Sequence, residues 1–377
     1  MKKLVAFILC MALVITCVAC FTACNPKDDG NNDSAMKVAM ITDYGDITDQ
    51  SFNQTTYEAC KAFSEDNNLG FKYFKPAGDS TEARVASVEQ AIQEGFNVIV
   101  MPGYAFGETV VEVAGTNPDV TFVALDVSQG DLGDKYVIPG NVATFVYHEE
   151  ISGFMAGYAA VKEGYKKLGF LGGMAVPAVI RFGYGFVQGV NAAAVEMNIA
   201  DKVSVNYVYG GKFGGTPEIT AAMDAWYSTG TEVVFASGGG IYTSACEAAT
   251  KEGINGKVIG VDSDQSYVIN KDYGEGVCIT SAMKGLAPTV QTVLEAIKDG
   301  KWSTYSGTVS NMGMVSGTDP SLNYVQLPTA TWSMKNFTKD DYAALVKKIY
   351  DGTIKISSDT SAMPTTTVKV TTQKNIH

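Results

Sequence analysis

The sequence predicts an α/β fold with doubly wound parallel sheets, on three observations. Six short apolar runs rich in Val and Ile recur along the chain, helical stretches separate them, and each run stops at a glycine, an aspartate or a small polar residue. Continuous apolar runs are typical of parallel strands that are buried on both faces. Strands that alternate with helices indicate doubly wound architecture. The runs are 38–43, 98–103, 120–126, 168–173, 233–238 and 258–262.

The intervening helices show periodicity or start signals. Residues 80–94 place apolar side chains at helical spacing. Thr216-Pro217-Glu218 supplies a cap, a first-turn proline and an acid for another helix.

The length and the grouping of the runs predict two α/β lobes. A chain of 377 residues exceeds the size at which a single hydrophobic core is usual. The six runs divide into two sets of three with a break near 140–150, and further strands are expected at 276–283 and 304–315. We therefore expect a chain that crosses between its lobes more than once.

The first residues are predicted to be a targeting segment. Two lysines precede an apolar run at 4–18, which is the pattern of a signal peptide. The sequence before and at Cys24 resembles a bacterial lipobox, in which the cysteine is lipid-modified and becomes the mature N-terminus. We expect 1–23 to be a lipoprotein signal peptide and 24–36 a flexible tether. The length of the apolar stretch alone leaves an uncleaved membrane span open.

Cysteine usage and charge restrict the possible partners. Beyond the targeting region, Cys60, Cys246 and Cys278 are odd in number and lack metal-ligand spacing, so we expect small core residues and no disulfide framework. The net charge of −12 argues against nucleic acid or anionic lipid as an electrostatically bound partner.

The loop after the first run concentrates polar groups and an aromatic ring. Its side chains are those of Asp43, Asp46, Asp49, Phe52 and Asn53. Ligands of open α/β sheets bind beyond the carboxyl ends of the strands, and a ring beside several hydrogen-bonding groups suits a flat polar heterocycle or a sugar. The same residues would serve structure alone if Asp49 or Ser51 capped the next helix and Phe52 packed into the core.

The other strand ends are glycine-rich or acidic. Glycine loops let a ligand approach backbone N–H groups, and acids accept hydrogen bonds, so two facing lobes lined in this way would form a binding cleft. Taken singly, each glycine loop is an ordinary tight turn, and each lone aspartate is a turn former or cap. The ends are 102–107, Asp126, 172–175, 237–242 and 262–265.

Catalytic chemistry has little support in the sequence. The only histidines are His148 and His377, and no nucleophile elbow is present, which argues against a Ser/His/Asp hydrolase. The glycine run at 238–240 lacks the Gly-Lys-Ser/Thr ending of a phosphate loop. The acids at 43–49 do not have the spacing of a calcium loop. We expect no catalytic residue, no metal and no cofactor.

Three motifs together resemble those of a known family. They are Thr42-Asp43-x-Gly45 followed by Asp49-x-Ser51-Phe52-Asn53-Gln54, then Gly169-Phe170-Leu171-Gly172-Gly173-Met174 with Arg181-Phe182 and Gly185-Phe186, and Ile259-Gly260-Val261-Asp262-Ser263-Asp264-Gln265. From about residue 37 to at least residue 284, the chain is similar to the basic membrane protein family. Its members are purine-nucleoside receptor lipoproteins that serve ATP-driven importers.

The resemblance implies the type I periplasmic-binding-protein fold, in which two doubly wound lobes are joined by a three-strand hinge. The first lobe would comprise 37–143 plus about 280–315. The second would comprise 144–279 plus about 316–377.

The resemblance also implies contacts to the base of a nucleoside. Phe52 would stack on the purine, and Asn53 and Asp126 would bond to its edge heteroatoms. The loop after the fifth strand has the family's glycine-rich start at Gly238 but differs beyond it, and Tyr242 is the candidate for the aromatic residue on the opposite face.

For the sugar, the resemblance implies that Asp43, Asp262 and Lys284 hold the ribose hydroxyls. The implied partners are a purine nucleoside (inosine, guanosine or adenosine), an ABC permease, and the membrane through a lipid anchor on the extracytoplasmic face. Riboflavin or another flat ligand in the same cleft, a surface nucleoside-cleaving enzyme, and a signalling or adhesion lipoprotein that binds no small molecule are the alternatives.

Overall fold

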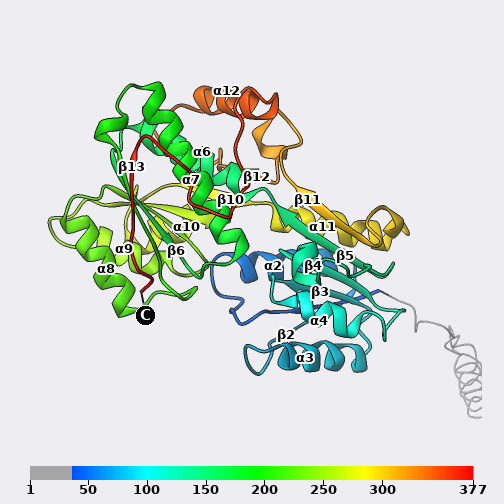
Figure 1. Ribbon diagram of the computed structural model, residues 1–377. Coiled ribbons are helices and arrows are strands. Elements are labelled where there is room, and N and C mark those ends of the chain that lie inside the picture. The colour runs from blue at the N-terminus through cyan, green and yellow to red at the C-terminus, as the bar shows by residue number, and fades with distance from the viewer. Residues whose placement is uncertain (1–35, 377) are drawn as a thin grey trace, which may run out of the picture. The chain divides into compact units, whose positions relative to one another are not determined.

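The structure is a computed structural model that describes residues 36–376 (Figure 1). The expected signal peptide, the lipidation site Cys24 and nearly all of the expected tether lie outside the described residues. Within 36–376, no helix combines the length and the apolar character needed to cross a bilayer.

The first of two sheets is entirely parallel. Its six strands stand in the order β11-β5-β4-β3-β1-β2. The strands are β1 (Lys37–Ile41), β2 (Gly70–Phe74), β3 (Val98–Pro102), β4 (Thr121–Leu125), β5 (Val142–Tyr147) and β11 (Thr308–Met312).

The second sheet has seven strands in the order β12-β10-β9-β8-β6-β7-β13. All neighbours are parallel except β12, which pairs antiparallel with β10. The strands are β6 (Lys167–Gly172), β7 (Ser204–Tyr209), β8 (Val233–Ser237), β9 (Lys257–Asp262), β10 (Cys278–Lys284), β12 (Val325–Gln326) and β13 (Lys369–Thr372).

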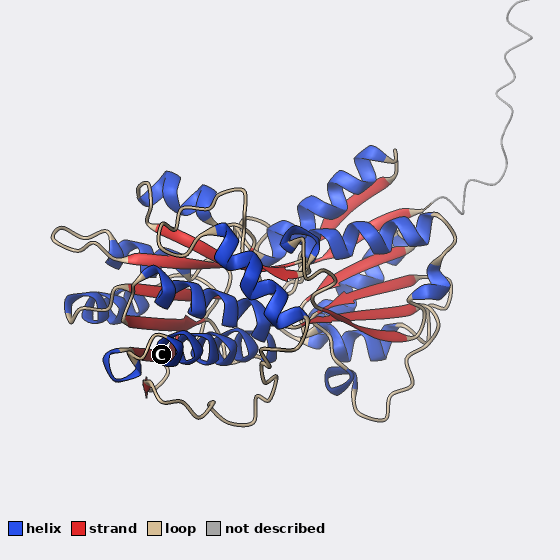
Figure 2. Ribbon diagram, turned by 90° about the horizontal axis from the view of Figure 1, so that it is seen from above, coloured by secondary structure: helices blue, strands red, loops and turns tan. Residues whose placement is uncertain are grey.

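Helices lie on both faces of each sheet (Figure 2), which confirms the doubly wound α/β class. All six apolar runs form strands, namely β1, β3, β4, β6, β8 and β9. The helices are α2 (Phe52–Asp66), α3 (Thr81–Gln93), α4 (Phe106–Val113), α5 (Gln129–Leu132), α6 (Glu149–Glu163), α7 (Pro177–Glu196), α8 (Pro217–Ser228), α9 (Tyr242–Ala249), α10 (Ser266–Tyr273), α11 (Leu286–Lys298) and α12 (Lys339–Tyr350).

The chain passes between the two sheets at three places: after β5, after β10 and after β11. Neighbouring backbone bonds tie these crossings together, because His148 N donates to Met312 O (3.1 Å), Tyr324 N to Gly313 O (3.0 Å) and Gly285 N to Tyr324 O (2.6 Å). We call the first sheet with α2–α5 and α11 the first lobe, and the second sheet with α6–α10 and α12 the second lobe. Because β10 pairs with β9 in the second sheet, the return to the first lobe follows Lys284 and not residue 280.

Helices α6 and α7 pack closely through glycines. A Cβ atom added at Gly153 or Gly157 would collide with backbone carbonyls of α7, and one added at Gly185 or Gly189 would collide with those of α6. Small residues four apart on both helices therefore let the two backbones approach each other. The pair covers the second sheet and supplies a large share of its core, including Phe154, Phe182 and Phe186.

The variant Gly189→Ala tests this packing. The added methyl group would collide with the carbonyl oxygen of Phe154, and backbone atoms cannot rotate away as a flexible side chain can. Although alanine is the better helix former, we expect the free energy of unfolding to fall by about 1–3 kcal/mol, as measured by urea denaturation. Gly78→Ala is the control because its added Cβ has no atom within 4 Å. Equal stability of the two variants would contradict the account of this interface.

Candidate functional site

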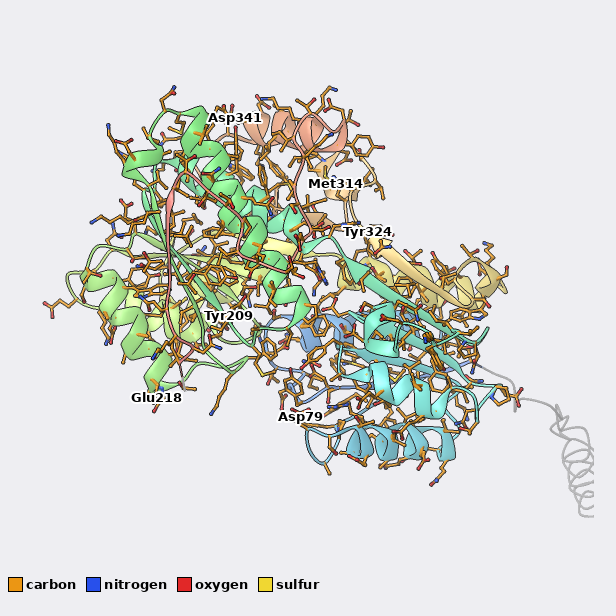
Figure 3. The ribbon with its side chains drawn as sticks, viewed as in Figure 1. Asp79, Tyr209, Glu218, Met314, Tyr324 and Asp341 are labelled. Atoms are coloured by element: carbon orange, nitrogen blue, oxygen red, sulfur yellow. The ribbon has the colours of Figure 1, made fainter. Side chains whose placement is uncertain are left out.

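A cavity of about 480 Å³ lies where the carboxyl ends of strands from both lobes meet. The β1–α2 loop, the start of α2, the β3–α4 loop and Asp126 after β4 line it from the first lobe. Residues of β8, β9, β10, α7 and the β7–α8 loop line it from the second. Asp79, labelled in Figure 3, lines it from the segment between β2 and α3. The structure brings together Asp43, Phe52, Asn53, Asp126, Gly238, Asp262 and Lys284 around this cavity.

The structure does not bring Tyr242 to the cavity, which corrects the sequence-based expectation for the opposite-face aromatic residue. Tyr242 is the first residue of α9 and is buried in a hydrophobic cluster with Ile219 and Cys246. The glycine run at 238–240 leads directly into α9, and the Tyr242 ring packs among the buried side chains of α8 and α9.

Two other aromatic rings of the second lobe line the cavity instead, those of Phe182 and Phe213. Phe213 stands in the loop between β7 and α8, and its ring stacks on Tyr44 of the first lobe with centroids 5.9 Å apart. Its ring lies against Gly173 and Gly238, where a Cβ atom would clash with it. An aromatic residue flanked by glycines on both sides, Gly210-Gly211-Lys212-Phe213-Gly214-Gly215, was a signal that could have identified it.

The loop between β1 and α2 is held by the carboxylates that it contains. Asp43 accepts hydrogen bonds from Gly45 N (2.6 Å) and Asn53 Nδ2 (3.2 Å). Asp49 accepts hydrogen bonds from the backbone N–H groups of Ser51, Asn53 and Gln54. It therefore caps the start of α2, as expected if this loop served structure alone. Asp43 and Asn53 remain at the cavity wall.

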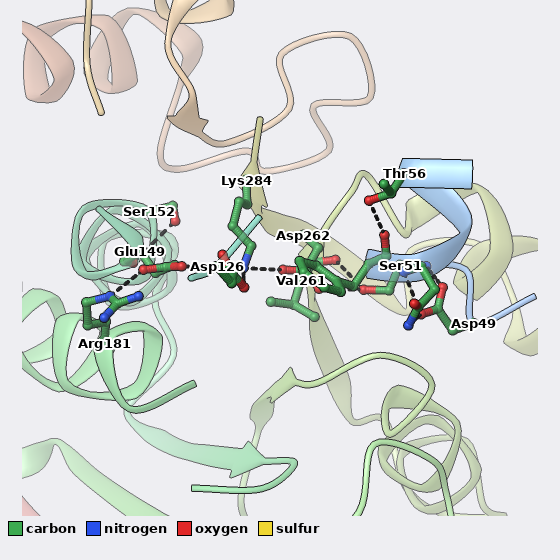
Figure 4. Close-up of polar contacts among 12 residues, drawn as sticks. Asp49, Ser51, Thr56, Asp126, Glu149, Ser152, Arg181, Val261, Asp262 and Lys284 are labelled. Carbon is green, nitrogen blue, oxygen red and sulfur yellow. Dashed lines mark hydrogen bonds and ion pairs between the residues drawn. The ribbon is translucent and has the colours of Figure 1, made fainter. Parts of the chain in front are cut away.

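Contacts across the cleft join the lobes near these residues. Ser51 is the N-cap residue of α2, but its side chain makes no capping hydrogen bond. Its Oγ donates instead to Asp262 Oδ2 at 2.8 Å (Figure 4). Gln50 O accepts from Ser263 Oγ at 3.1 Å and from Gln265 Nε2 at 3.2 Å.

Backbone strain concentrates at the same place. Gln50, Asp126 and Asp262 are non-glycine residues with φ of 55°, 60° and 64°, in the left-handed region that L residues rarely adopt. Such conformations persist where the surrounding structure fixes them, and they gather at functional sites.

A buried cluster of charges lies at one end of the cavity. Lys284 Nζ is 2.7 Å from Asp126 Oδ2, 3.3 Å from Glu149 Oε1 and 3.7 Å from Asp262 Oδ1. Arg181 Nε donates to Glu149 Oε2, so the cluster holds two cations and three carboxylates (Figure 4). Neither Glu149 nor Arg181 was predicted to belong to this cluster, although Arg181 stands in the second motif, because no local sequence pattern reports a buried ion pair.

Burial shifts the proton affinities of these groups. It raises the pKa of Asp43 and of Asp126 from 3.8 to about 6, and it also raises the pKa of Asp262. For Lys284, burial opposes protonation, but the attraction of Asp126, Glu149 and Asp262 outweighs it and raises the pKa of the ammonium. For Glu149, burial is likewise outweighed, by Arg181 and Lys284, and the pKa is lowered.

Several polar atoms at the cavity have no partner. Among the described residues, Asn53 Oδ1, Asp126 Oδ1 and Ser237 Oγ are buried and make no hydrogen bond, and all three residues line the cavity. Buried polar groups are nearly always satisfied, so these atoms indicate a place where a ligand supplies the missing donors.

The charge of the wall indicates the kind of ligand. Among the charged residues of the lining, the acids Asp43, Asp46, Asp49, Asp79, Asp126 and Asp262 outnumber the cations, which are Lys212 and the already paired Lys284. No group of His, Cys, Asp and Glu in residues 36–376 is arranged to hold a metal ion. The arrangement therefore suits a neutral molecule with a flat ring and several hydroxyl or N–H donors.

The chain matches known proteins over most of its length. The profile of a family described as "ABC transporter substrate-binding protein PnrA-like" matches residues 36–360. The "ABC transporter nucleoside-binding protein BmpA" of Lactococcus lactis subsp. cremoris is 27% identical over 336 residues, covering 84% of this chain and 90% of that protein. "Basic membrane protein B" of Borreliella burgdorferi is 28% identical over 287 residues, covering 75% and 79%.

Solved structures agree on the fold. An ABC transporter solute-binding protein from Aeropyrum pernix K1 superposes with a TM-score of 0.66 at 19% identity, covering 86% of this chain and 88% of that one. A solute-binding protein from Conexibacter woesei gives 0.64 at 22% identity, covering 86% and 99%. At these identities the likeness concerns the fold alone, and it confirms the type I periplasmic-binding-protein architecture. The cavity between two α/β lobes and the match across residues 36–360 lead to one conclusion: the chain belongs to the basic membrane protein family of PnrA-like ABC transporter substrate-binding proteins.

Proposed function

We propose that this protein captures purine nucleosides in the cavity between its lobes and delivers them to an ABC permease. The observation that carries the proposal is the convergence, on one cavity, of an aromatic ring, buried carboxylates and unpartnered polar atoms from both lobes. The volume of about 480 Å³ lies within the range usual for small-molecule sites. One relative, from Lactococcus lactis, is named as nucleoside-binding, which supports the same ligand class.

The base would lie against the ring of Phe52. That ring already has a cation on one side, since Lys284 Nζ is 4.8 Å from its centroid. Phe213, which lines the cavity from the second lobe, would take the role on the opposite face that was expected of Tyr242. Asn53 Oδ1 and Asp126 Oδ1 are acceptors without partners, so they would accept hydrogen bonds from N–H groups on the purine edge.

The sugar would be held by Asp43, Asp262 and Lys284. Carboxylates accept paired hydrogen bonds from a ribose diol, and such bonds to an ionised acceptor are stronger than neutral ones. The acidic wall would repel a phosphate group, so the ligand is the free nucleoside (inosine, guanosine or adenosine) and not a nucleotide.

The delivery role rests on family membership and on the N-terminal sequence. Substrate-binding proteins of this family act with an ABC permease. Lipid modification at Cys24 would tether the protein to the extracytoplasmic face of the membrane. Closure of the lobes about the three crossings would then present the loaded protein to its permease.

Incubation of the purified protein with inosine, guanosine and adenosine separates a receptor from an enzyme. A receptor returns the nucleosides intact and bound, whereas a nucleoside-cleaving enzyme releases free base, which chromatography detects. Riboflavin, titrated in parallel, tests the other flat ligand of the same cleft. Tight riboflavin binding without nucleoside binding would replace the proposal by that alternative, and a protein that binds none of these would be a lipoprotein of another kind.

The variant Phe52→Ala tests the stacking contribution. Stacking on an aromatic side chain contributes roughly 1–3 kcal/mol per base, so we expect nucleoside affinity to fall by about 5- to 150-fold in calorimetric titration. Tyr57→Ala is a matched control, because Tyr57 lies in the same helix α2 with a similar intermediate exposure but outside the cavity lining. Unchanged affinity in Phe52→Ala would refute the stacking role.

A further inference from the structure

Glu149 and Arg181 lie behind the cavity and not in its wall. Neither residue lines the cavity, and the Glu149 side chain is fully buried. Glu149 Oε1 is 3.3 Å from Lys284 Nζ, and Glu149 Oε2 accepts from Arg181 Nε. A chain of contacts therefore runs from Arg181 through Glu149 to Lys284 (Figure 4). Of these three residues, Lys284 is the one that lines the cavity.

The three residues belong to one lobe. Lys284 ends β10, Glu149 begins α6 and Arg181 lies near the start of α7, and the glycine-mediated packing of α6 on α7 fixes the two helices against each other. The carboxylate nearest to the Lys284 ammonium is that of Asp126, at 2.7 Å, and Asp126 follows β4 in the first lobe. Opening of the lobes would thus remove Asp126 from Lys284 but leave Glu149 in place.

The position of the ammonium needs such a support. A lysine has a flexible four-carbon stem and three donors, and the other carboxylates near Lys284, those of Asp126 and Asp262, line the cavity. With only these two partners, the ammonium would lose Asp126 when the lobes open and keep only the more distant Asp262, at 3.7 Å. Glu149 holds it from the side away from the cavity, and Arg181 fixes Glu149 and offsets its charge.

We propose that Glu149 and Arg181 are positioning residues that hold Lys284 at the cavity wall, so that the lysine is already in place when a nucleoside enters. The inference rests on the proposed function, because it assigns these two residues a part in the affinity for the same ligand. Neither residue touches the ligand.

The main test is the double variant Glu149→Gln/Arg181→Gln. Removal of either charge alone would leave a buried charge unpaired and endanger folding, whereas removal of both leaves the net charge of the cluster unchanged. We expect the double variant to fold and to bind nucleoside about tenfold more weakly than the wild type, as measured by calorimetric titration. The single variant Arg181→Lys keeps a positive charge near Glu149, so we expect it to bind nucleoside more tightly than the double variant does. Wild-type affinity in the double variant would overturn the inference.

The matched control is Lys162→Met/Glu196→Gln. This ion pair, with Lys162 Nζ 3.0 Å from Glu196 Oε1, joins the same two helices at their other ends. If only the packing of α6 on α7 mattered, both double variants would lose affinity alike, and that result would overturn the inference. We expect the control to bind as the wild type does.

A lysine-free background separates positioning from general structure. In Lys284→Met, the additional change Glu149→Gln/Arg181→Gln should cost no further affinity, because the residue to be positioned is absent. An equal loss in both backgrounds would show that Glu149 and Arg181 act by another route.

A measurement without ligand keeps this inference distinct from the proposed function. The NMR signal of the Lys284 ammonium should be sharp and slow to exchange with water in the ligand-free wild type and in the control. It should broaden and exchange faster in the Glu149→Gln/Arg181→Gln variant. A wild type that binds no purine nucleoside refutes the proposed function, while an ammonium signal that is the same in all three proteins refutes the positioning role.

Discussion

Replacement of Lys284 by methionine is expected to weaken nucleoside binding greatly and to destabilise the protein strongly. Asp126, Glu149 and Asp262 all face the ammonium within 3.7 Å. Without it, these buried carboxylates repel one another, and loss of one partner from a buried ion cluster costs about 3–5 kcal/mol. Binding falls too, because the proposed donor to the ribose is gone and the carboxylates no longer hold their positions. We expect affinity to drop by a hundredfold or more, on the order of 3 kcal/mol.

Thermal unfolding measures the expected loss of stability in Lys284→Met, and calorimetric titration measures the expected loss of affinity. The destabilisation of Lys284→Met should become smaller as the pH is lowered, because protonation relieves the repulsion among the carboxylates. Lys301→Met is the control, since Lys301 is an exposed lysine paired only with Asp299 at the surface. If Lys284→Met unfolds like this control at neutral pH, the buried charge cluster does not have the importance assigned to it.

Nucleoside affinity is expected to fall as the solution becomes acidic, with Asp43 as a principal cause. Burial raises the pKa of Asp43 to about 6, and the ribose hydroxyls need its ionised form as acceptor. Below that pKa, each pH unit costs about tenfold in affinity for a group that must lose its proton on binding. Between about pH 7.5 and about pH 5, we therefore expect the dissociation constant to rise by about tenfold from this group alone.

The stability of the ligand-free protein should change with pH in the opposite sense. An acid whose pKa is higher in the folded state than its ordinary 3.8 binds more protons folded than unfolded between 3.8 and about 6. Stability without ligand therefore falls as the pH rises through this window, and bound nucleoside should reverse part of that loss.

Titrations at several pH values in wild type and in Asp43→Asn measure the effect. The variant should bind more weakly at neutral pH and show a flatter pH profile. The comparison removes contributions common to both proteins, such as that of His148, whose pKa is raised by its bond to Glu150. A pH profile of the same steepness in both proteins would exclude Asp43 as the titrating group.

The sequence predicted those strands that are buried on both faces, because such strands appear in the sequence as continuous apolar runs. Every continuous apolar run became a strand inside a sheet. Three strands at or near the edges, β2, β7 and β13, were missed because they alternate buried and exposed residues or are mostly exposed, whereas the edge strand β11 was expected at 304–315. Strand β5 is buried but was read as part of the break between the lobes.

The site could be predicted where its residues directly end strands or begin helices. Asp43, Asp126, Asp262 and Lys284 follow or end β1, β4, β9 and β10, and parallel sheets bring such ends together. Phe213 was missed because it lies in a loop whose path depends on contacts with Gly173 and Gly238, which are distant in the sequence.

The ligand that accompanies the purified protein tests the central claim most directly. Native mass spectrometry of the protein, before and after addition of inosine, guanosine and adenosine, should show one intact purine nucleoside per chain, lost on denaturation. A protein that carries no nucleoside from the cell and takes up none of the three at saturating concentration would contradict the account.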